Sequence, residues 1–220
     1  RQARLREALE TYESAHRGGY WTGINIAALR LLLGHPGAAR EAAAEVEAIC
    51  RRELAGLDEE AGERRYWTLA TLGEAALLRG RWQEACEWYG RAVDSSDRKW
   101  GNVATTRRQA RLILAALRPA EAERELIEGC LRIPAVAVFA GHQVDRPDRE
   151  APRFPPALEC TVREALAARM LEAGVGFGYS SGAMGSDLVF QECLRDLQAE
   201  AHLILPYPEA EFIRDSVVVG

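Results

Sequence analysis

Apolar side chains in the first 130 residues recur at helical spacing, as Leu69, Leu72 and Ala76 do. Alanine, leucine, arginine and glutamate, which are strong helix formers, dominate this half of the chain. Glycine, proline or clustered polar residues interrupt the pattern at residues 17–20, 34–37, 55–63, 79–81 and 95–102. The pattern therefore predicts about six helices over this half, paired as hairpins.

A different period follows residue 133. Short apolar runs rich in β-branched residues alternate with helix-like segments, after a first loop rich in proline and charge. The expected strands are 135–141, 175–182 and 202–208, the loop is 142–156, and the expected helices are 157–174 and 186–201. Such alternation is typical of a parallel sheet covered by helices, with right-handed crossovers. We therefore predict the fold class α + α/β, with a helical domain at 1–130 and a Rossmann-like domain at 131–220.

The predicted sheet is small, because three strands are fewer than a complete doubly wound sheet contains. Either further strands follow Gly220 or a partner covers the open edge. The chain begins with Arg1 rather than Met and stops at "DSVVVG", directly after a β-like run. We therefore expect a fragment of a longer protein.

One helical hairpin shows a repeat pattern of small and bulky residues. In residues 66–93 the pair Leu72-Gly73 precedes a series of matching positions, namely Gly80, Trp82, Ala85, Tyr89 and Ala92. These spacings resemble a tetratricopeptide repeat. A weaker copy spans residues 24–46, where Gly34 matches Gly80 and Ala39 matches Ala85 at an interval of 46 residues. The resemblance implies a small, irregular helical solenoid, and such solenoids bind proteins on a concave face or act as spacers.

The five tryptophans all lie in the helical half, at positions 21, 67, 82, 88 and 100. They are candidates for anchors at a protein interface. We expect them instead to pack between helices, because Trp82 and Tyr89 stand where the repeat needs bulk.

Composition excludes several classes of protein. Hydrophobic residues make up 48% and charged residues 28% of the 220 residues, as in ordinary globular proteins. The net charge of −5 argues against binding of duplex nucleic acid, which needs a basic face, although a local basic groove stays open as an alternative. No apolar run approaches the roughly 18 residues of a membrane span, and no signal peptide is visible. We expect a cytoplasmic protein with no membrane partner.

The five cysteines show no metal-binding or redox spacing. None forms a CxxC pair, and no Cys/His cluster has the spacing of a metal site; the cysteines are Cys50, Cys86, Cys130, Cys160 and Cys193. Several have apolar neighbours in helical stretches. We therefore expect buried, reduced thiols and no bound metal.

Three chain segments are expected to meet at the carboxyl ends of the strands, where open parallel sheets bind ligands. The first strand ends in Gly141-His142, the second runs into a glycine-rich turn, and the third ends at Pro206-Tyr207. The turn and its flanks comprise Ser180, Ser181, Gly182, Ala183, Met184, Gly185, Ser186 and Asp187.

The glycine-rich turn has the features of an anion site. Gly182 and Gly185 allow positive φ and a close approach of the backbone, and the N-terminus of a helix follows. The turn contains no lysine that could neutralise a triphosphate. A mononucleotide, a nucleotide sugar or a small cyclic-nucleotide-like messenger fits better, and no cofactor is certain.

Two interpretations stand for most polar residues near the turn. Asp187 either stabilises the first helical turn or accepts hydrogen bonds from a ribose, and Ser186 is the expected N-cap. His142 either contacts a ligand or is structural. Arg146 and Arg153 either close over an anion or are solvated loop charges. No nucleophile–base set can be assigned. The candidates for catalysis are therefore two carboxylates near the turn, Asp187 and Glu192.

The second half resembles the SLOG superfamily of Rossmann-like nucleotide-ligand domains, which includes YpsA-like and DprA proteins and the LOG-type phosphoribohydrolases. The pattern Gly-Ala-x-Gly-x-Asp after the second strand is matched by Gly182, Ala183, Gly185 and Asp187. In the family, one strand ends in Pro-Phe, and Pro206-Tyr207 corresponds to it here. The family's opening strand ends in Gly, which corresponds to Gly141. The resemblance implies a nucleotide-derived ligand. The PGGxGTxxE motif that supplies the LOG catalytic glutamate is absent, which puts an enzymatic function in doubt.

The first half resembles the tetratricopeptide-like TRAF-binding region of apoptosis-signal-regulating kinases and its bacterial relatives, on residues 20–34 and 66–93. Together the two resemblances imply a signalling adaptor or sensor, with a protein partner or neighbouring signalling domain on the helical half. Two alternatives stay open. One is a hydrolase of the N-glycosidic bond of a nucleotide or NAD, and the other is a structural scaffold that forms homo-oligomers.

Overall fold

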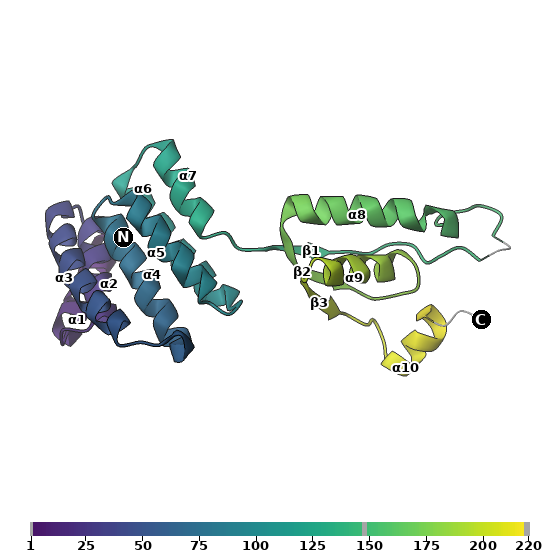
Figure 1. Ribbon diagram of the computed structural model, residues 1–220, viewed down its shortest axis with the longest axis horizontal. Coiled ribbons are helices and arrows are strands. Elements are labelled where there is room, and N and C mark those ends of the chain that lie inside the picture. Colours follow the sequence, from purple (N-terminus) through teal and green to yellow (C-terminus); the bar gives the residue numbers. More distant parts are fainter. Residues whose placement is uncertain (1, 147–148, 218–220) are drawn as a thin grey trace. The chain divides into compact units, whose positions relative to one another are not determined.

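The computed structural model describes residues 2–146 and 149–217. It divides into two compact units, Arg1–Ile133 and Pro134–Gly220 (Figure 1). The first unit is helical and the second is built on a parallel sheet, so the predicted fold class α + α/β is confirmed.

The described part of the helical unit contains seven α-helices, where about six were predicted. They are α1 (Gln2–Ala15), α2 (Tyr20–Leu32), α3 (Pro36–Ala55), α4 (Gly62–Leu78), α5 (Trp82–Asp94), α6 (Trp100–Leu117) and α7 (Glu121–Cys130), with a short 3₁₀ turn at Glu59–Ala61. The additional break separates α6 from α7 at Arg118 and Pro119, where Arg118 is left-handed with φ 52°. Proline lacks an N–H and disfavours a helical residue before it, which ends α6.

Two hairpins, α2–α3 and α4–α5, turn in the same way. Gly34 and Gly80 both have positive φ, at 89° and 72°. The N–H of His35 donates to the carbonyl of Arg30 at 2.9 Å, and the N–H of Arg81 donates to that of Ala76 at 3.0 Å. Since these bonds recur at the interval of 46 residues, the correspondence between the two hairpins is confirmed.

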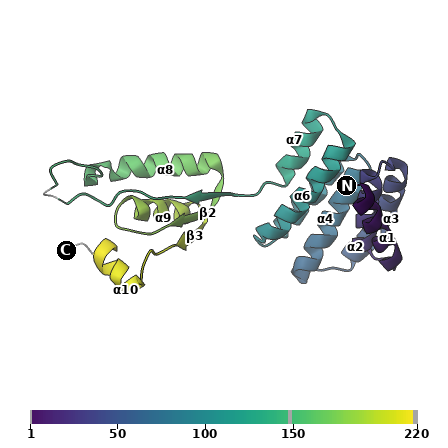
Figure 2. The same cartoon turned by 180° about the vertical axis from the view of Figure 1, so that it is seen from behind.

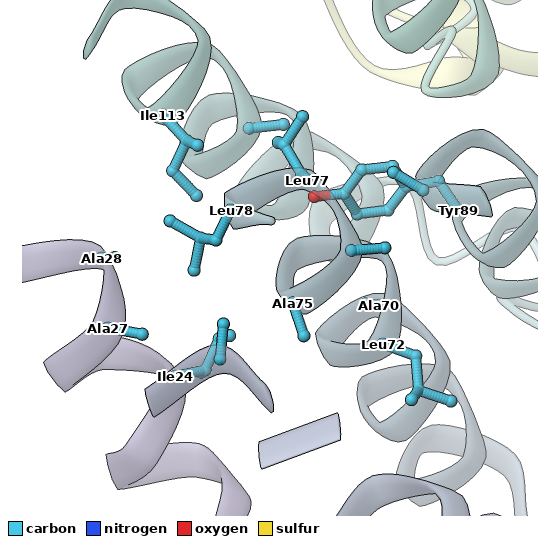
Figure 3. Packing of buried hydrophobic residues seen from close by; sticks show 14 of the residues in the cluster. Ile24, Ala27, Ala28, Ala70, Leu72, Ala75, Leu77, Leu78, Tyr89 and Ile113 are labelled. Carbon is cyan, nitrogen blue, oxygen red and sulfur yellow. The ribbon is translucent and has the colours of Figure 1, made fainter. Parts of the chain in front are cut away.

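Small residues on α4 allow α5 to pack closely against it. The ring of Tyr89 is fully buried and lies against Gly73, where a Cβ atom would come within 2.5 Å of the ring. Figure 3 shows Tyr89 reaching across to α4, and Ala27 and Ala28 of α2 on the other side of the same core. Gly73 therefore sets the distance between these helices.

A buried carboxylate links α3 to the α4–α5 turn. Glu47 is only 7% exposed and forms ion pairs with Arg51, Arg79 and Arg81. Burial alone would raise the pKa of Glu47, but hydrogen bonds from Arg81 and Arg51 outweigh it and leave the pKa below its usual value. The charge of Glu47 is thus compensated inside the unit.

The expectation of five reduced cysteines is wrong for one pair. Cys86 of α5 and Cys130 at the end of α7 form a disulfide, with Cα atoms 5.6 Å apart. The pairing joins residues 44 apart in the chain, and it depends on the packing of α5 against α7, which cysteine spacing does not reveal. Cys50 is a buried free thiol whose pKa burial raises to about 12, so it is unreactive.

The second unit contains a three-stranded parallel sheet in the order β1-β2-β3. Its elements are β1 (Ala135–Val138), a 3₁₀ turn (Pro156–Leu158), α8 (Glu159–Ala173), β2 (Val175–Ser180), α9 (Ser186–Asp196), β3 (Glu200–Leu203) and α10 (Glu209–Phe212), followed by a helical turn at Ile213–Val217. Helices α8 and α9 pack together on one face of the sheet, around Met170 and Phe190, as two right-handed crossovers in one direction require (Figure 2).

The third strand comes earlier than predicted, and the helix before it is shorter. Helix α9 ends at Asp196 because Gln198 adopts a positive φ of 53° and Ala199 N–H bonds back to the Leu194 carbonyl. The polar start of β3 hid this strand in the sequence pattern. The β-like run near the C-terminus is likewise helical through Val217, and residues 218–220 lie outside the described residues.

The opposite face of the sheet is not covered by α8 or α9. Val136 and Val138 of β1 point to that face and are 62% and 82% exposed. Their partners on β2 are Phe177 and Tyr179, and the Tyr179 ring stacks on His202 of β3 at 4.5 Å between centroids. A fully doubly wound sheet would carry helices on this face as well.

We expect Gly73→Ala to lower the free energy of unfolding of the helical unit by about 1–3 kcal/mol, because the new methyl group overlaps the Tyr89 ring. Gly90→Ala in α5 is the matched control, since nothing lies within 4 Å of its added Cβ. That change should be neutral or stabilise by up to about 1 kcal/mol. Urea unfolding followed by helical circular dichroism measures both, and equal effects of the two changes would contradict the packing role.

Candidate functional site

The glycine-rich turn lies where β2 ends, beside the end of β1, as the sequence predicts. The N–H of Gly141, which follows β1, donates to Asp187 Oδ1 at 2.9 Å. The N–H and the hydroxyl of Ser186 both donate to the carbonyl of His142, at 3.1 and 2.9 Å. The segments after β1 and β2 are therefore held together by the first turn of α9.

Asp187 is buried, and both of its carboxylate oxygens are bonded. Oδ1 accepts from Gly141 N–H and Oδ2 accepts from the hydroxyl of Ser181. With 5% exposure, the carboxylate lies inside the turn rather than on its surface. This geometry favours the interpretation of Asp187 as a residue that stabilises the turn and the helix start.

The helix cap differs from the prediction in one residue. Gly185, not Ser186, is the N-cap, and Ser186 is the first residue of α9. Gly185 has a φ of 112°, and a Cβ atom there would come within 2.7 Å of the His142 carbonyl oxygen. Only glycine fits this conformation and this contact. Gly185 therefore allows the turn after β2 to pack closely against the segment after β1.

The amides of the turn divide into two groups. Met184 N–H donates to the carbonyl of Ser216 at 2.7 Å, and Ser186 N–H is bonded to His142. The N–H groups of Gly182, Ala183 and Gly185 have no hydrogen-bond partner among the described residues. The second group could bind an anion through backbone donors.

The other predicted site residues lie apart from these amides. The Ser180 hydroxyl accepts from Gln191 Nε2 at 2.7 Å and is buried under α9. Pro206 and Tyr207 follow β3 by a few residues, and the Tyr207 hydroxyl lies 3.1 Å from Ser216 Oγ. The C-terminal segment thus reaches the turn at Met184, whereas Pro206 and Tyr207 do not end the strand as predicted.

The remaining charged candidates form pairs or face solvent. Glu192 binds Arg163 of α8 at 3.2 Å, on the outside of the α8–α9 pair. Arg146 and Arg153 are exposed, and the backbone N–H of Arg153 donates to Asp145 Oδ2 at 2.7 Å, which folds the loop. The side chain of His142 is exposed, and its contribution to the turn is its carbonyl oxygen.

The helical unit contains a groove that the sequence did not reveal. It has a volume of about 390 Å³ and is lined by the first helices of three successive hairpins, α2, α4 and α6. Its lining includes Trp21, Asn25, Trp67, Thr71, Glu74, Thr105, Arg108, Gln109 and Leu112. Four tryptophans pack against the core as predicted, but Trp21 is 62% exposed at this groove.

Glu74 is the one acidic residue among the described residues that line the groove. It is partly buried, and its Oε1 accepts from Gln109 Nε2 at 3.0 Å. Burial raises the pKa of Glu74 to about 7, although the bond from Gln109 lowers it. The signal in the sequence was a glutamate directly after Leu72-Gly73, in a stretch of α4 that is otherwise buried.

No family model matches the chain, and comparisons with curated proteins and with solved structures find no significant match. In the described residues, no helix is long and apolar enough to cross a membrane. The same residues contain no group of three or more His, Cys, Asp or Glu side chains that could hold a metal ion.

We expect Asp187→Ala to destabilise the sheet unit by about 1–3 kcal/mol, because it removes a buried acceptor that bonds the N–H of Gly141 and the hydroxyl of Ser181. Asp187→Asn should retain most of the stability, since its amide oxygen can accept from Gly141. Asp196→Ala is the control, because Asp196 forms only exposed ion pairs, with Arg163 at 2.7 Å and with Arg195 at 3.5 Å, and such pairs contribute little to stability. Thermal unfolding of the three variants provides the comparison, and equal losses for Asp187→Ala and Asp196→Ala would disprove the anchoring role.

The raised pKa of Glu74 predicts a pH-dependent stability. Between the unfolded value of 4.5 and about 7, the unfolded chain loses this proton and the folded chain keeps it. The contribution of Glu74 to stability is therefore fully present below pH 4.5 and is lost as the pH rises to about 7. Glu74→Gln should raise the free energy of unfolding by about 1–3 kcal/mol at pH 8 and change it little at pH 4. Urea titrations at the two pH values test this, and an effect independent of pH would contradict it.

Proposed function

We propose that the helical unit binds an extended segment of a partner protein in the groove between α2, α4 and α6. The observation that carries the proposal is the exposed indole of Trp21 at a groove of about 390 Å³ lined by three hairpins. Tryptophan is enriched among the side chains that dominate binding energy at interfaces, and helical solenoids present such concave surfaces to partners.

The rest of the groove supports a ligand with both apolar and polar groups. Trp67 and Leu112 offer apolar surface, while Asn25, Thr105 and Gln109 add hydrogen-bonding groups. A peptide in extended conformation presents the same mixture of side chains and backbone amides. The likeness of this half to tetratricopeptide-like regulatory regions supports an adaptor function by analogy.

A library of random 15-residue peptides, selected on the immobilised chain, tests the proposal. Trp21→Ala should weaken the selected peptides at least tenfold, because it removes an exposed aromatic anchor without opening the core. Leu171→Ala is the matched control, since Leu171 is 69% exposed in the sheet unit and lies outside the groove. Absence of any selected peptide, or equal weakening by both changes, would refute the proposed groove function.

A second candidate function concerns the glycine-rich turn, where we propose a nucleotide-type anionic ligand. The three amides of Gly182, Ala183 and Gly185, without described partners at the carboxyl end of β2, favour it. Titration with nucleotides, NAD derivatives and cyclic nucleotides should shift the NMR signals of these amides, whereas adenosine without a phosphate should not. Unchanged signals with all phosphate ligands would exclude this candidate.

The geometry gives less support to hydrolysis of an N-glycosidic bond. Asp187 is engaged through both oxygens, and Glu192 is paired with Arg163 away from the turn. A catalytic carboxylate must reach the reacting carbon of the substrate. In this proposal the turn therefore binds its ligand rather than cleaving it.

A further inference from the structure

The groove of the helical unit contains an acid that no described cation neutralises. Glu74 accepts one hydrogen bond, at Oε1 from Gln109, and no described group bonds its second carboxylate oxygen. Two other acids of this unit that are buried or partly buried have arginine partners: Glu47 has three, and Glu128 pairs with Arg111 at 2.7 Å. Glu74 has no arginine partner among the described residues, and it lies in the lining of a groove.

Two tryptophan side chains line the groove together with Glu74. Trp21 of α2 and Trp67 of α4 line the same groove, and the orientation of the Trp67 ring is supported by an edge contact with Tyr66, at 4.9 Å between ring centroids. Indole faces attract lysine and arginine cations, most strongly where water is partly excluded. A carboxylate combined with indole rings is a recognition surface for a cation.

We infer that the groove takes the lysine or arginine side chain of a bound peptide, with its cationic group against Glu74 and its aliphatic stem along the indole rings. This inference rests on the proposed function of the groove and specifies the chemistry of its partner. Burial disfavours the ionised form of the Glu74 carboxylate, and the bound cation would compensate its charge. Its methylene groups would cover apolar surface of Trp21 and Trp67.

Arg108 is the one basic residue among the described residues that line the groove. Its positive charge would repel a ligand cation that bound beside it. It is exposed on α6 and forms no hydrogen bond or ion pair with a described residue. An anionic ligand would instead be drawn to Arg108 and repelled by Glu74. The two residues therefore distinguish the inferred cation from an anion.

The test uses the full chain and the peptides selected by the library, resynthesised with each position replaced in turn by all 20 residues. One position should require lysine or arginine, and norleucine or citrulline there should weaken binding at least tenfold. Glu74→Gln should remove this preference, whereas the exposed control Glu87→Gln on α5 should keep it. Arg108→Gln should leave binding unchanged or strengthen it.

Ionisation of Glu74 provides a separate readout. With a pKa of about 7, the ionised fraction of Glu74 falls about tenfold from pH 8 to pH 6, and the affinity for an arginine peptide should fall with it. Among the described residues, the other charged or titratable groups near Glu74 are Arg108 on α6, which lines the same groove, and Tyr89 on α5, and the lining from α2 includes none. Burial raises the pKa of Tyr89 well above its ordinary value, so Tyr89 stays protonated in this range.

The outcomes separate the inference from the function on which it rests. If no peptide binds, the proposed function and this inference both fail. If peptides bind but show no preference for a basic residue, or if Arg108→Gln abolishes binding while Glu74→Gln does not, the cation site is disproved and the peptide groove stands. A basic preference that Glu74→Gln removes, with affinity that rises with pH, supports the inference.

Discussion

The contact of Tyr89 with Gly73 is the constraint on which the helical unit depends. A full tyrosine ring fits against α4 only because position 73 has no side chain, and this brings α4 and α5 to a fixed distance. One face of α4 packs against α5. Trp67, Thr71 and Glu74, which are spaced four and three residues apart, lie on another face and line the groove with α2 and α6. The position of the groove therefore follows from the packing behind it.

The sheet unit depends on a comparable crossing of two chain segments. Asp187 and Ser186 bond to the backbone after β1, and Gly185 allows the approach, so the glycine-rich turn is firmly tied to its neighbour. The same features that suggest an anion site in the sequence thus have a structural use. What is left for a ligand is the backbone of Gly182, Ala183 and Gly185, rather than the carboxylate of Asp187.

Charge is distributed differently in the two candidate sites. In the groove, a partly buried acid lacks a cationic partner, while elsewhere in the unit arginines surround such acids, as around Glu47. In the turn, the acid is already bonded to its own chain and only neutral donors are available. The site proposed in the groove would therefore bind a cation, and the site proposed in the turn would bind an anion.

The sequence by itself determined the class of fold, the hairpin turns at Gly34 and Gly80, and the place of the glycine-rich turn after β2, because these depend on local periodicity and on glycine conformation. Only the tertiary structure decided the Cys86–Cys130 pairing, the engagement of Asp187 and the groove around Glu74. Each of these joins residues from helices or strands distant in sequence. Their partners follow from packing distances that no local pattern encodes.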